Sequence, residues 1–113
     1  MVSSVESVRM DQQGTFKYIQ ICINDGQSVT TVIRGWLDCD YHADVLDKFN
    51  SKERQPAGVK VYCPGGGRIT IKDKKIVIFG YSVGFGKADH AVTCQIIQEA
   101  MPDYTVEWNN DGY

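Results

Sequence analysis

The sequence has no apolar run long enough to cross a bilayer and no tract of basic residues. Its 12 Lys and Arg residues are outweighed by 14 Asp and Glu residues, so the formal net charge of -2 favours neither nucleic acid nor a membrane as a partner. The first 14 residues lack the apolar segment of a secretory signal, so we expect a cytoplasmic protein. With 113 residues the chain can form one domain with one modest core, and we expect it to act as a monomer.

Closely spaced cysteines and metal-ligand patterns are also missing. The four cysteines are scattered: Cys22, Cys39, Cys63 and Cys94. Zinc ribbons and thioredoxin-like sites need close pairs, which excludes both. Two disulfides are formally possible, but without an export signal we expect reduced thiols. The only histidines, His42 and His90, have no metal-ligand spacing around them, so we expect no metal and no other cofactor.

Several catalytic signatures are nearly present but have the wrong spacing. Cys63 and Arg68 have four residues between them, whereas the phosphate loop of cysteine-dependent tyrosine phosphatases has five. Gly86-Lys87 is followed by neither Ser nor Thr, which argues against a nucleotide-triphosphate loop. The glycines at 80, 84 and 86 do not make the dinucleotide-binding motif.

What the sequence does contain is a clear strand pattern from Thr15 onward. One face carries Lys17, Ile19, Ile21 and Ile23, and the other carries Tyr18, Gln20 and Cys22. Lys17 begins the face that the isoleucines bury, so its ammonium group either extends to water or approaches an anion at the end of the strand.

The remaining elements predict a mixed fold. Further strands are expected at 29–36, 59–63, 68–72, 75–79 and 104–108, with Pro64-Gly65-Gly66-Gly67 as a turn. One helix is expected from His42 to about residue 50. A second follows Asp89 and ends before Pro102, with Val92, Ile96, Ile97 and Ala100 on its inner face. We therefore predict a single α/β domain over residues 14–113, with about six strands in a mixed or antiparallel sheet packed with two helices. Residues 1–13 are expected to form a loose arm, and 109–113 a polar tail.

A histidine at the start of the first helix is the leading candidate for chemistry. Asp40 is a good N-cap residue, which places His42 and Ala43 in the first turn, where backbone N–H groups lack partners. Such a helix start attracts anions and disfavours a charged imidazole. A neutral His42 could accept a proton or attack phosphorus; the alternative is that it only decorates the helix end.

A glycine-punctuated loop at 80–87 is the second candidate. It can present the N–H groups of Ser82, Val83 and Gly84 to an anion, although such turns often serve geometry alone. His90 follows this loop and could line the site or help to cap the second helix.

Taken together, these motifs resemble the Janus family of phosphohistidine phosphatases. The matching stretches are Gly14-Thr15-Phe16-Lys17-Tyr18, Ile33-Arg34-Gly35, Tyr41-His42-Ala43-Asp44, Gly65-Gly66-Gly67-Arg68-Ile69, Gly80-Tyr81-Ser82, Ala88-Asp89-His90-Ala91, Pro102-Asp103-Tyr104 and Asn110-Asp111-Gly112-Tyr113. Each stretch is weak alone, but their order and joint occurrence over nearly the whole chain are specific.

The resemblance implies a metal-independent hydrolase that removes phosphate from phosphohistidine in proteins, with phospholysine as a second candidate substrate. It implies that His42 is catalytic, as a general base or a transient nucleophile. The implied substrate- and phosphate-binding residues are Lys17, Ala43, Arg68, Ser82, Val83 and Gly84. Supporting positions in the family are matched by Arg34, Tyr41 and His90. Val83-Gly84-Phe85 departs from the family pattern, which leaves peptide preference open. A non-catalytic module that binds a phospho-ligand is the rival interpretation.

Overall fold

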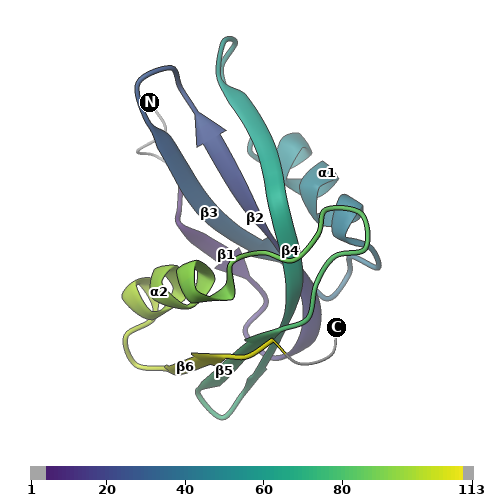
Figure 1. Ribbon diagram of the computed structural model, residues 1–113, viewed down its shortest axis with the longest axis vertical. Coiled ribbons are helices and arrows are strands. Elements are labelled where there is room, and N and C mark those ends of the chain that lie inside the picture. The colour runs from purple at the N-terminus through teal and green to yellow at the C-terminus, as the bar shows by residue number, and fades with distance from the viewer. Residues whose placement is uncertain (1–4, 111–113) are drawn as a thin grey trace.

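A six-stranded mixed sheet forms the centre of the molecule, with one helix against each face (Figure 1). In this computed structural model, which describes residues 5–110, the strands are β1 (Val8–Met10), β2 (Gly14–Asn24), β3 (Val29–Gly35), β4 (Lys60–Lys72), β5 (Lys75–Phe79) and β6 (Thr105–Trp108). Their spatial order is β1-β3-β2-β4-β5-β6, with parallel pairing at both edges and antiparallel pairing between. The helices are α1 (His42–Lys52) and α2 (His90–Ala100). The predicted α/β fold class is confirmed; residues 1–4 of the predicted arm and 111–113 of the predicted tail lie outside the described residues.

The alternation predicted for β2 places its two faces under different helices. Ile19, Ile21 and Ile23 are fully buried and cluster with Val45 and Phe49 of α1. The other face of β2 packs into the cluster that includes α2. Burying an isoleucine side chain stabilises a fold by about 1.5–3 kcal/mol, so both faces of the sheet contribute to the core.

The turn predicted at the glycine run is wrong: β4 is one strand that continues through these glycines. Gly66 and Gly67 pair with residues of β2. A Cβ on Gly66 would lie 2.5 Å from the carbonyl oxygen of Tyr18, and one on Gly67 would lie 2.5 Å from that of Phe79. These glycines therefore allow close backbone approach. Pro64 lies where the register shifts, at a bulge that tolerates a residue without an N–H group.

The prediction of a loose arm is wrong for Val8–Met10, which form β1 at the edge of the sheet. β1 runs parallel to β3, with Val8 opposite Ile33. Val8 and Met10 both pack against the core cluster to which Ile33 belongs. Three residues are too few to show a period in the sequence, so only pairing with β3 defines this strand.

The inner face of α2 also differs from the prediction. Its buried residues are His90, Thr93 and Ile97, whereas Val92 and Ala100 are exposed. Asp89 does cap the helix, since its Oδ1 accepts the N–H of Ala91. The helix turns a polar face inward because β2 presents polar side chains to it, and those groups need hydrogen-bond partners when buried.

Candidate functional site

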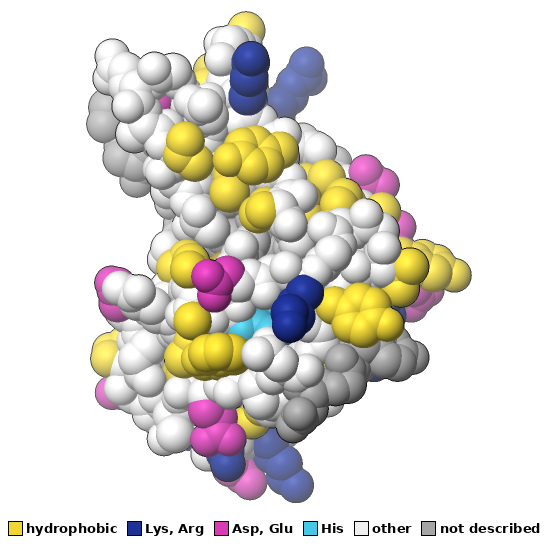
Figure 2. All heavy atoms as spheres, in the orientation of Figure 1, with side chains coloured by type: hydrophobic (Ala, Val, Ile, Leu, Met, Phe, Trp, Pro, Cys, Tyr) yellow, Lys and Arg dark blue, Asp and Glu magenta, His cyan; other side chains and the backbone are white. Residues whose placement is uncertain are grey.

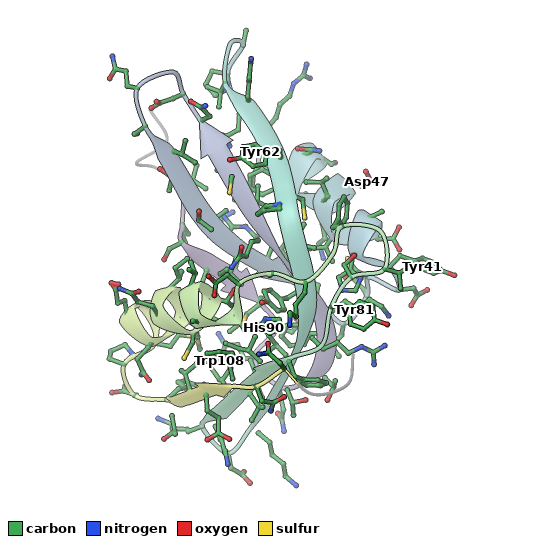
Figure 3. All side chains as sticks on the ribbon, in the orientation of Figure 1. Tyr41, Asp47, Tyr62, Tyr81, His90 and Trp108 are labelled. Atoms are coloured by element: carbon green, nitrogen blue, oxygen red, sulfur yellow. The ribbon has the colours of Figure 1, made fainter. Side chains whose placement is uncertain are left out.

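A cavity of about 590 Å³ opens between the start of α1, the β2–β4 pair and the loop after β5. It is lined by Lys17, Tyr41, His42, Ala43, Arg68, Tyr81, Ser82, Val83, Gly84 and Phe85. Figure 3 shows Tyr41 and Tyr81 on the same side of the molecule, although they come from different segments. Eight residues that the sequence singled out as site or supporting residues thus lie around one hollow.

The start of α1 supplies backbone N–H groups to this cavity. The N-cap is Tyr41 rather than the predicted Asp40, so the cap lies one residue later than expected. The backbone N–H of Tyr41 donates a hydrogen bond to the Asp44 carboxylate at 3.1 Å. The side chain of the third helical residue thus satisfies the N–H group of the cap residue. His42 and Ala43 are still the first two helical residues, and their N–H groups have no intrahelical acceptor.

The ring of His42 is buried and held against the glycine run of β4. Its Nε2 lies 2.9 Å from the carbonyl oxygen of Gly67. A carbonyl can only accept, so Nε2 carries the proton and Nδ1 keeps its lone pair. The Cδ2 edge lies close to Gly66, so the edge with Nδ1 faces away from β4. Burial lowers the pKa of His42, although the Gly67 hydrogen bond opposes that shift.

Two cations complete the electrostatics of the cavity. Lys17 of β2 and Arg68 of β4 are directly paired across the antiparallel ladder, so their side chains leave the same face of the sheet. Both charges lower the pKa of His42 further, because a positive neighbour disfavours the imidazolium form. A neutral imidazole thus lies beside a positively charged region suited to an anion.

The loop after β5 is a tight turn that leaves two N–H groups available. Ser82 and Gly86 exchange backbone hydrogen bonds of 3.1 and 2.8 Å, and the Ser82 hydroxyl accepts the N–H of Phe85 at 3.1 Å. The N–H of Ser82 is therefore engaged and cannot also serve as the predicted anion donor. Within residues 5–110, the N–H groups of Val83 and Gly84 have no hydrogen-bond partner. These two remain candidates for binding an anion.

Arg34 and His90, which the sequence marked as supporting residues, do not line the cavity. Arg34 is fully buried and binds Glu53 through Nε at 2.8 Å and Nη2 at 2.7 Å. Nε2 of His90 donates to the Gly80 carbonyl at 2.7 Å, and its Nδ1 accepts from the Tyr18 hydroxyl at 2.7 Å. Burial lowers the pKa of His90, consistent with this neutral state. His90 thus anchors the residue that begins the loop.

Two lining residues, Tyr81 and Phe85, were not predicted as site residues. Both flank the residues chosen as anion donors. The signal that could have identified them is an aromatic residue on each side of the three predicted anion donors; Tyr81 is exposed, and Phe85 is half-buried against the core cluster of α1.

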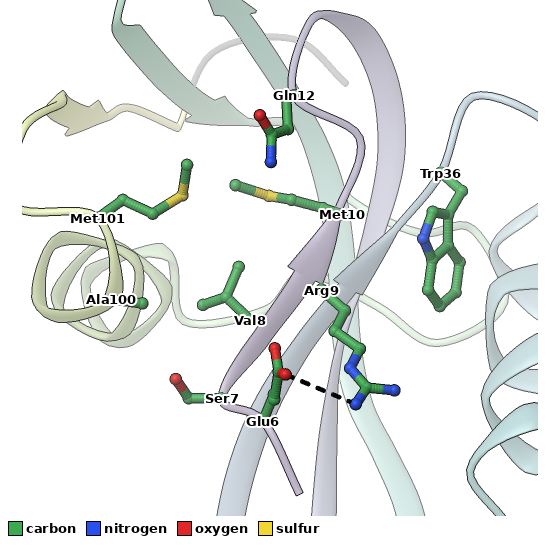
Figure 4. A pocket seen from close by; sticks show the side chains of 9 residues that line it. All are labelled: Glu6, Ser7, Val8, Arg9, Met10, Gln12, Trp36, Ala100 and Met101. Carbon is green, nitrogen blue, oxygen red and sulfur yellow. Dashed lines mark ion pairs between the residues drawn. The ribbon is translucent and has the colours of Figure 1, made fainter.

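A second hollow, of about 630 Å³, lies on the β1 side of the molecule (Figure 4). It is lined by Glu6, Ser7, Val8, Arg9, Met10, Gln12, Trp36, Ala100 and Met101. Arg9 is the only basic residue in this lining. Its guanidinium group lies 3.7 Å from the Glu6 carboxylate and 3.3 Å from the Glu53 carboxylate. Because its cation is already neutralised and no histidine lines it, this hollow is a weaker candidate for phosphate chemistry despite its size.

The cysteines are all free, as predicted. No group of three or more His, Cys, Asp or Glu residues that could hold a metal ion occurs in the described part of the chain. Over the same residues, neither helix has the length and apolar character needed to cross a membrane.

The fold and this cavity define a small α/β protein that holds a neutral histidine next to two cations and a helix N-terminus. The chain belongs to the Janus/Ocnus family, whose sequence model matches residues 2–105. It is 44% identical over 115 aligned residues to the sex-regulated protein janus-A of Drosophila orena, covering 99% of this chain and 84% of that protein. It is 38% identical over 121 residues to the 14 kDa phosphohistidine phosphatase of Sus scrofa, covering 99% and 95%. The Homo sapiens protein of that name is also 38% identical, over 118 residues, covering 96% and 94%.

Proposed function

We propose that this protein hydrolyses the P–N bond of phosphohistidine in proteins, without a metal ion, at the cavity around His42. The observation that carries the proposal is the neutral His42 ring beside Lys17 and Arg68. A phosphoryl group carries negative oxygens, and negative charge must be stabilised as the group is transferred. The two cations and the N–H groups of Ala43, Val83 and Gly84 would supply that stabilisation.

Two routes use the same atoms. In the first, Nδ1 of His42 takes a proton from water while the water oxygen bonds to phosphorus and the P–N bond breaks. In the second, Nδ1 attacks phosphorus directly, the substrate imidazole leaves, and water later cleaves the new P–N bond. In both, the departing imidazole nitrogen must gain a proton. The hydrogen bond from Nε2 to Gly67 holds the ring in the tautomer that either route requires.

The named pig and human relatives support a phosphatase, since both are 14 kDa phosphohistidine phosphatases. The alternative is a module that binds a phospho-ligand without turnover. The Drosophila relatives are more similar to this chain and are named only as sex-regulated proteins, which keeps this alternative open. Phospholysine is a further candidate substrate, because its P–N bond would present the same phosphoryl oxygens.

A phosphate-release assay on a protein containing phosphohistidine separates the two functions. We expect release by the wild type and loss of nearly all release by His42→Ala. His42→Gln is the matched variant, because its amide can still donate to Gly67 but has no basic nitrogen. If His42→Gln keeps the circular dichroism spectrum and loses release, His42 acts in chemistry. Saturable binding by the wild type without any release would instead support the module.

Rapid-quench labelling distinguishes the two routes of hydrolysis. An acid-labile phosphate on His42 that forms and decays at the turnover rate would exclude direct water attack as the sole route. Activity that survives treatment with a chelator would support metal independence. The cytoplasmic and monomeric states stay predictions, which cell fractionation and sedimentation can test.

A further inference from the structure

Exposed apolar side chains gather around this cavity. Among the described residues, the exposed large hydrophobic side chains are Val29, Leu37, Tyr41, Tyr62, Tyr81, Val83, Val92 and Trp108. The two most exposed of them, Val83 at 88% and Tyr41 at 70%, both line the cavity, and so does Tyr81. Figure 2 shows hydrophobic side chains exposed at the edge of the face where Figure 3 labels Tyr41 and Tyr81.

A fourth exposed apolar residue, Leu37, lies on the other side of the cations. It lines a smaller hollow of about 180 Å³, and Lys17 and Arg68 line both hollows. The two hollows thus share the cation pair as part of their linings. We call Leu37, Tyr41, Tyr81 and Val83 the apolar collar.

Isolated hydrophobic residues on a surface are ordinary, but four around one charged centre are unusual. Tyr41 caps α1 through its backbone, and Val83 lies in a turn that is held by Ser82 and Gly86. These structural roles need neither an aromatic nor a branched apolar side chain. The collar therefore fits contact with another molecule better than it fits stabilisation of the fold.

We propose that the apolar collar binds the polypeptide that carries the phosphoryl group, by contacting the imidazole ring of the phosphorylated residue and apolar side chains beside it. This inference rests on the proposed function for the anion site. With the phosphoryl group held at Lys17 and Arg68, the rest of the residue must leave through the mouth that the collar surrounds. A flat imidazole can stack on the exposed tyrosine rings there. The collar would thus favour phosphoryl groups on proteins over small phosphoryl compounds.

Binding to two ligands tests the collar independently of turnover. One ligand is a peptide that carries a hydrolysis-resistant phosphoryl-triazole in place of phosphohistidine, and the other is inorganic phosphate. The test variants are Tyr41→Ser and Leu37→Ser, since neither residue supplies a donor to the proposed anion site. Tyr62→Ser and Val29→Ser are matched controls, since these residues are also exposed, at 50% and 54%, but line neither hollow. Figure 3 shows Tyr62 well separated from Tyr41 and Tyr81.

We expect each test variant to weaken peptide binding by about five- to tenfold, the size of one lost aromatic or aliphatic contact, and phosphate binding by less than about twofold. The controls should change neither Kd by more than about twofold. Equal weakening of both ligands in the test variants, or equal effects in the controls, would overturn the proposal. Unchanged peptide binding in both Tyr41→Ser and Leu37→Ser, or no peptide binding by the wild type, would also overturn it. A wild-type dimer that Tyr41→Ser dissociates would assign the collar to self-association instead.

The collar and the proposed function can fail separately. Selective loss of peptide binding in the test variants, with no phosphate release by the wild type, would support the collar and refute the enzyme. Phosphate release by the wild type, with both ligands affected alike, would support the enzyme and refute the collar.

Discussion

Lys17 and Arg68 lie directly opposite each other on neighbouring antiparallel strands, and their side chains share one face of the sheet. Like charges at such a position destabilise a sheet, typically by a few tenths of a kcal/mol up to about 1 kcal/mol. The pair is adjacent to the helix start that carries His42 and lines the same cavity. An anion bound between the two cations would offset this repulsion, so the arrangement couples phosphate binding to stability.

Replacing Lys17 with methionine should stabilise the protein without ligand while weakening its response to phosphate. Lys17→Met keeps an unbranched side chain and removes one of the two opposed charges, so we expect the unfolding free energy to rise by about 0.5 kcal/mol. Phosphate at 100 times its Kd should stabilise the wild type by about 2.7 kcal/mol, and the variant much less at that concentration. Urea unfolding with and without phosphate measures both effects.

Lys60→Met is the control for this prediction, because Lys60 is an exposed residue opposite Asn24 and lines neither hollow. Its unfolding free energy should change by less than about 0.5 kcal/mol, and its response to phosphate should match the wild type. A destabilised Lys17→Met protein that still responds fully to phosphate would refute the role of the cation pair.

The activity should have an acidic limb set by His42. Burial and the charges of Lys17 and Arg68 lower the pKa of His42 below its ordinary value of 6.5. The neutral base is therefore the main form at pH 7, and kcat/KM should stay level until the pH falls below 6.5. An NMR titration of the His42 ring should give a midpoint below 6.5. A midpoint above 6.5 would contradict the environment described for this ring.

Stability should also fall on acidification, with both histidines contributing. Burial lowers the pKa of His90, as it does that of His42, so both are neutral in the folded state. The unfolded chain binds protons first as the pH drops through 6.5. The stability contributed by the neutral rings is thus present above 6.5 and lost as the pH falls through the lowered pKa values. Unfolding free energies between pH 7.5 and 5 should show this slope, and His90→Gln should reduce it.

Gly66→Ala should damage the protein far more than Gly84→Ala. A Cβ at Gly66 would meet the Tyr18 carbonyl at 2.5 Å and the His42 ring at 2.9 Å, whereas one at Gly84 would meet nothing within 4 Å. We expect Gly66→Ala to lower the unfolding free energy by about 2 kcal/mol or more and Gly84→Ala by less than about 0.5 kcal/mol. Chemical denaturation provides the comparison. Equal stability of the two variants would show that β4 can shift away from β2.

Arg34→Met should affect folding rather than substrate binding. Arg34 is fully buried, pairs with Glu53 and lies over the Phe49 ring at 5.4 Å. Breaking a buried ion pair typically costs about 3–5 kcal/mol of stability. Because Arg9 remains to neutralise Glu53, we expect the unfolding free energy to fall by an amount near the lower end of that range. The KM of the folded fraction should match the wild type, because Arg34 does not line the cavity. A raised KM with unchanged stability would contradict this prediction and show that Arg34 contributes to substrate binding.

Much of the fold could be predicted from local patterns. The alternation in β2 correctly assigned its faces. The cap predicted at Asp40 lies one residue too early, but His42 and Ala43 do lie in the first helical turn, as predicted. These predictions succeeded because residues adjacent in the chain determine the period of a strand or the cap of a helix. β1 could not be found in this way, since its three residues gain their partners only from β3.

By itself, the sequence determined which residues are candidates for binding an anion, because a histidine at a helix start, a lysine near a strand end and a turn of small residues are local features. Only the tertiary structure decided how they combine. Pairing of β2 with β4 places Lys17 opposite Arg68, and the continuous β4 brings Gly67 to the His42 ring. The same structure engages the N–H of Ser82 and assigns Arg34 to Glu53. These contacts join residues far apart in the chain, and their geometry depends on strand register and packing, which no local pattern specifies.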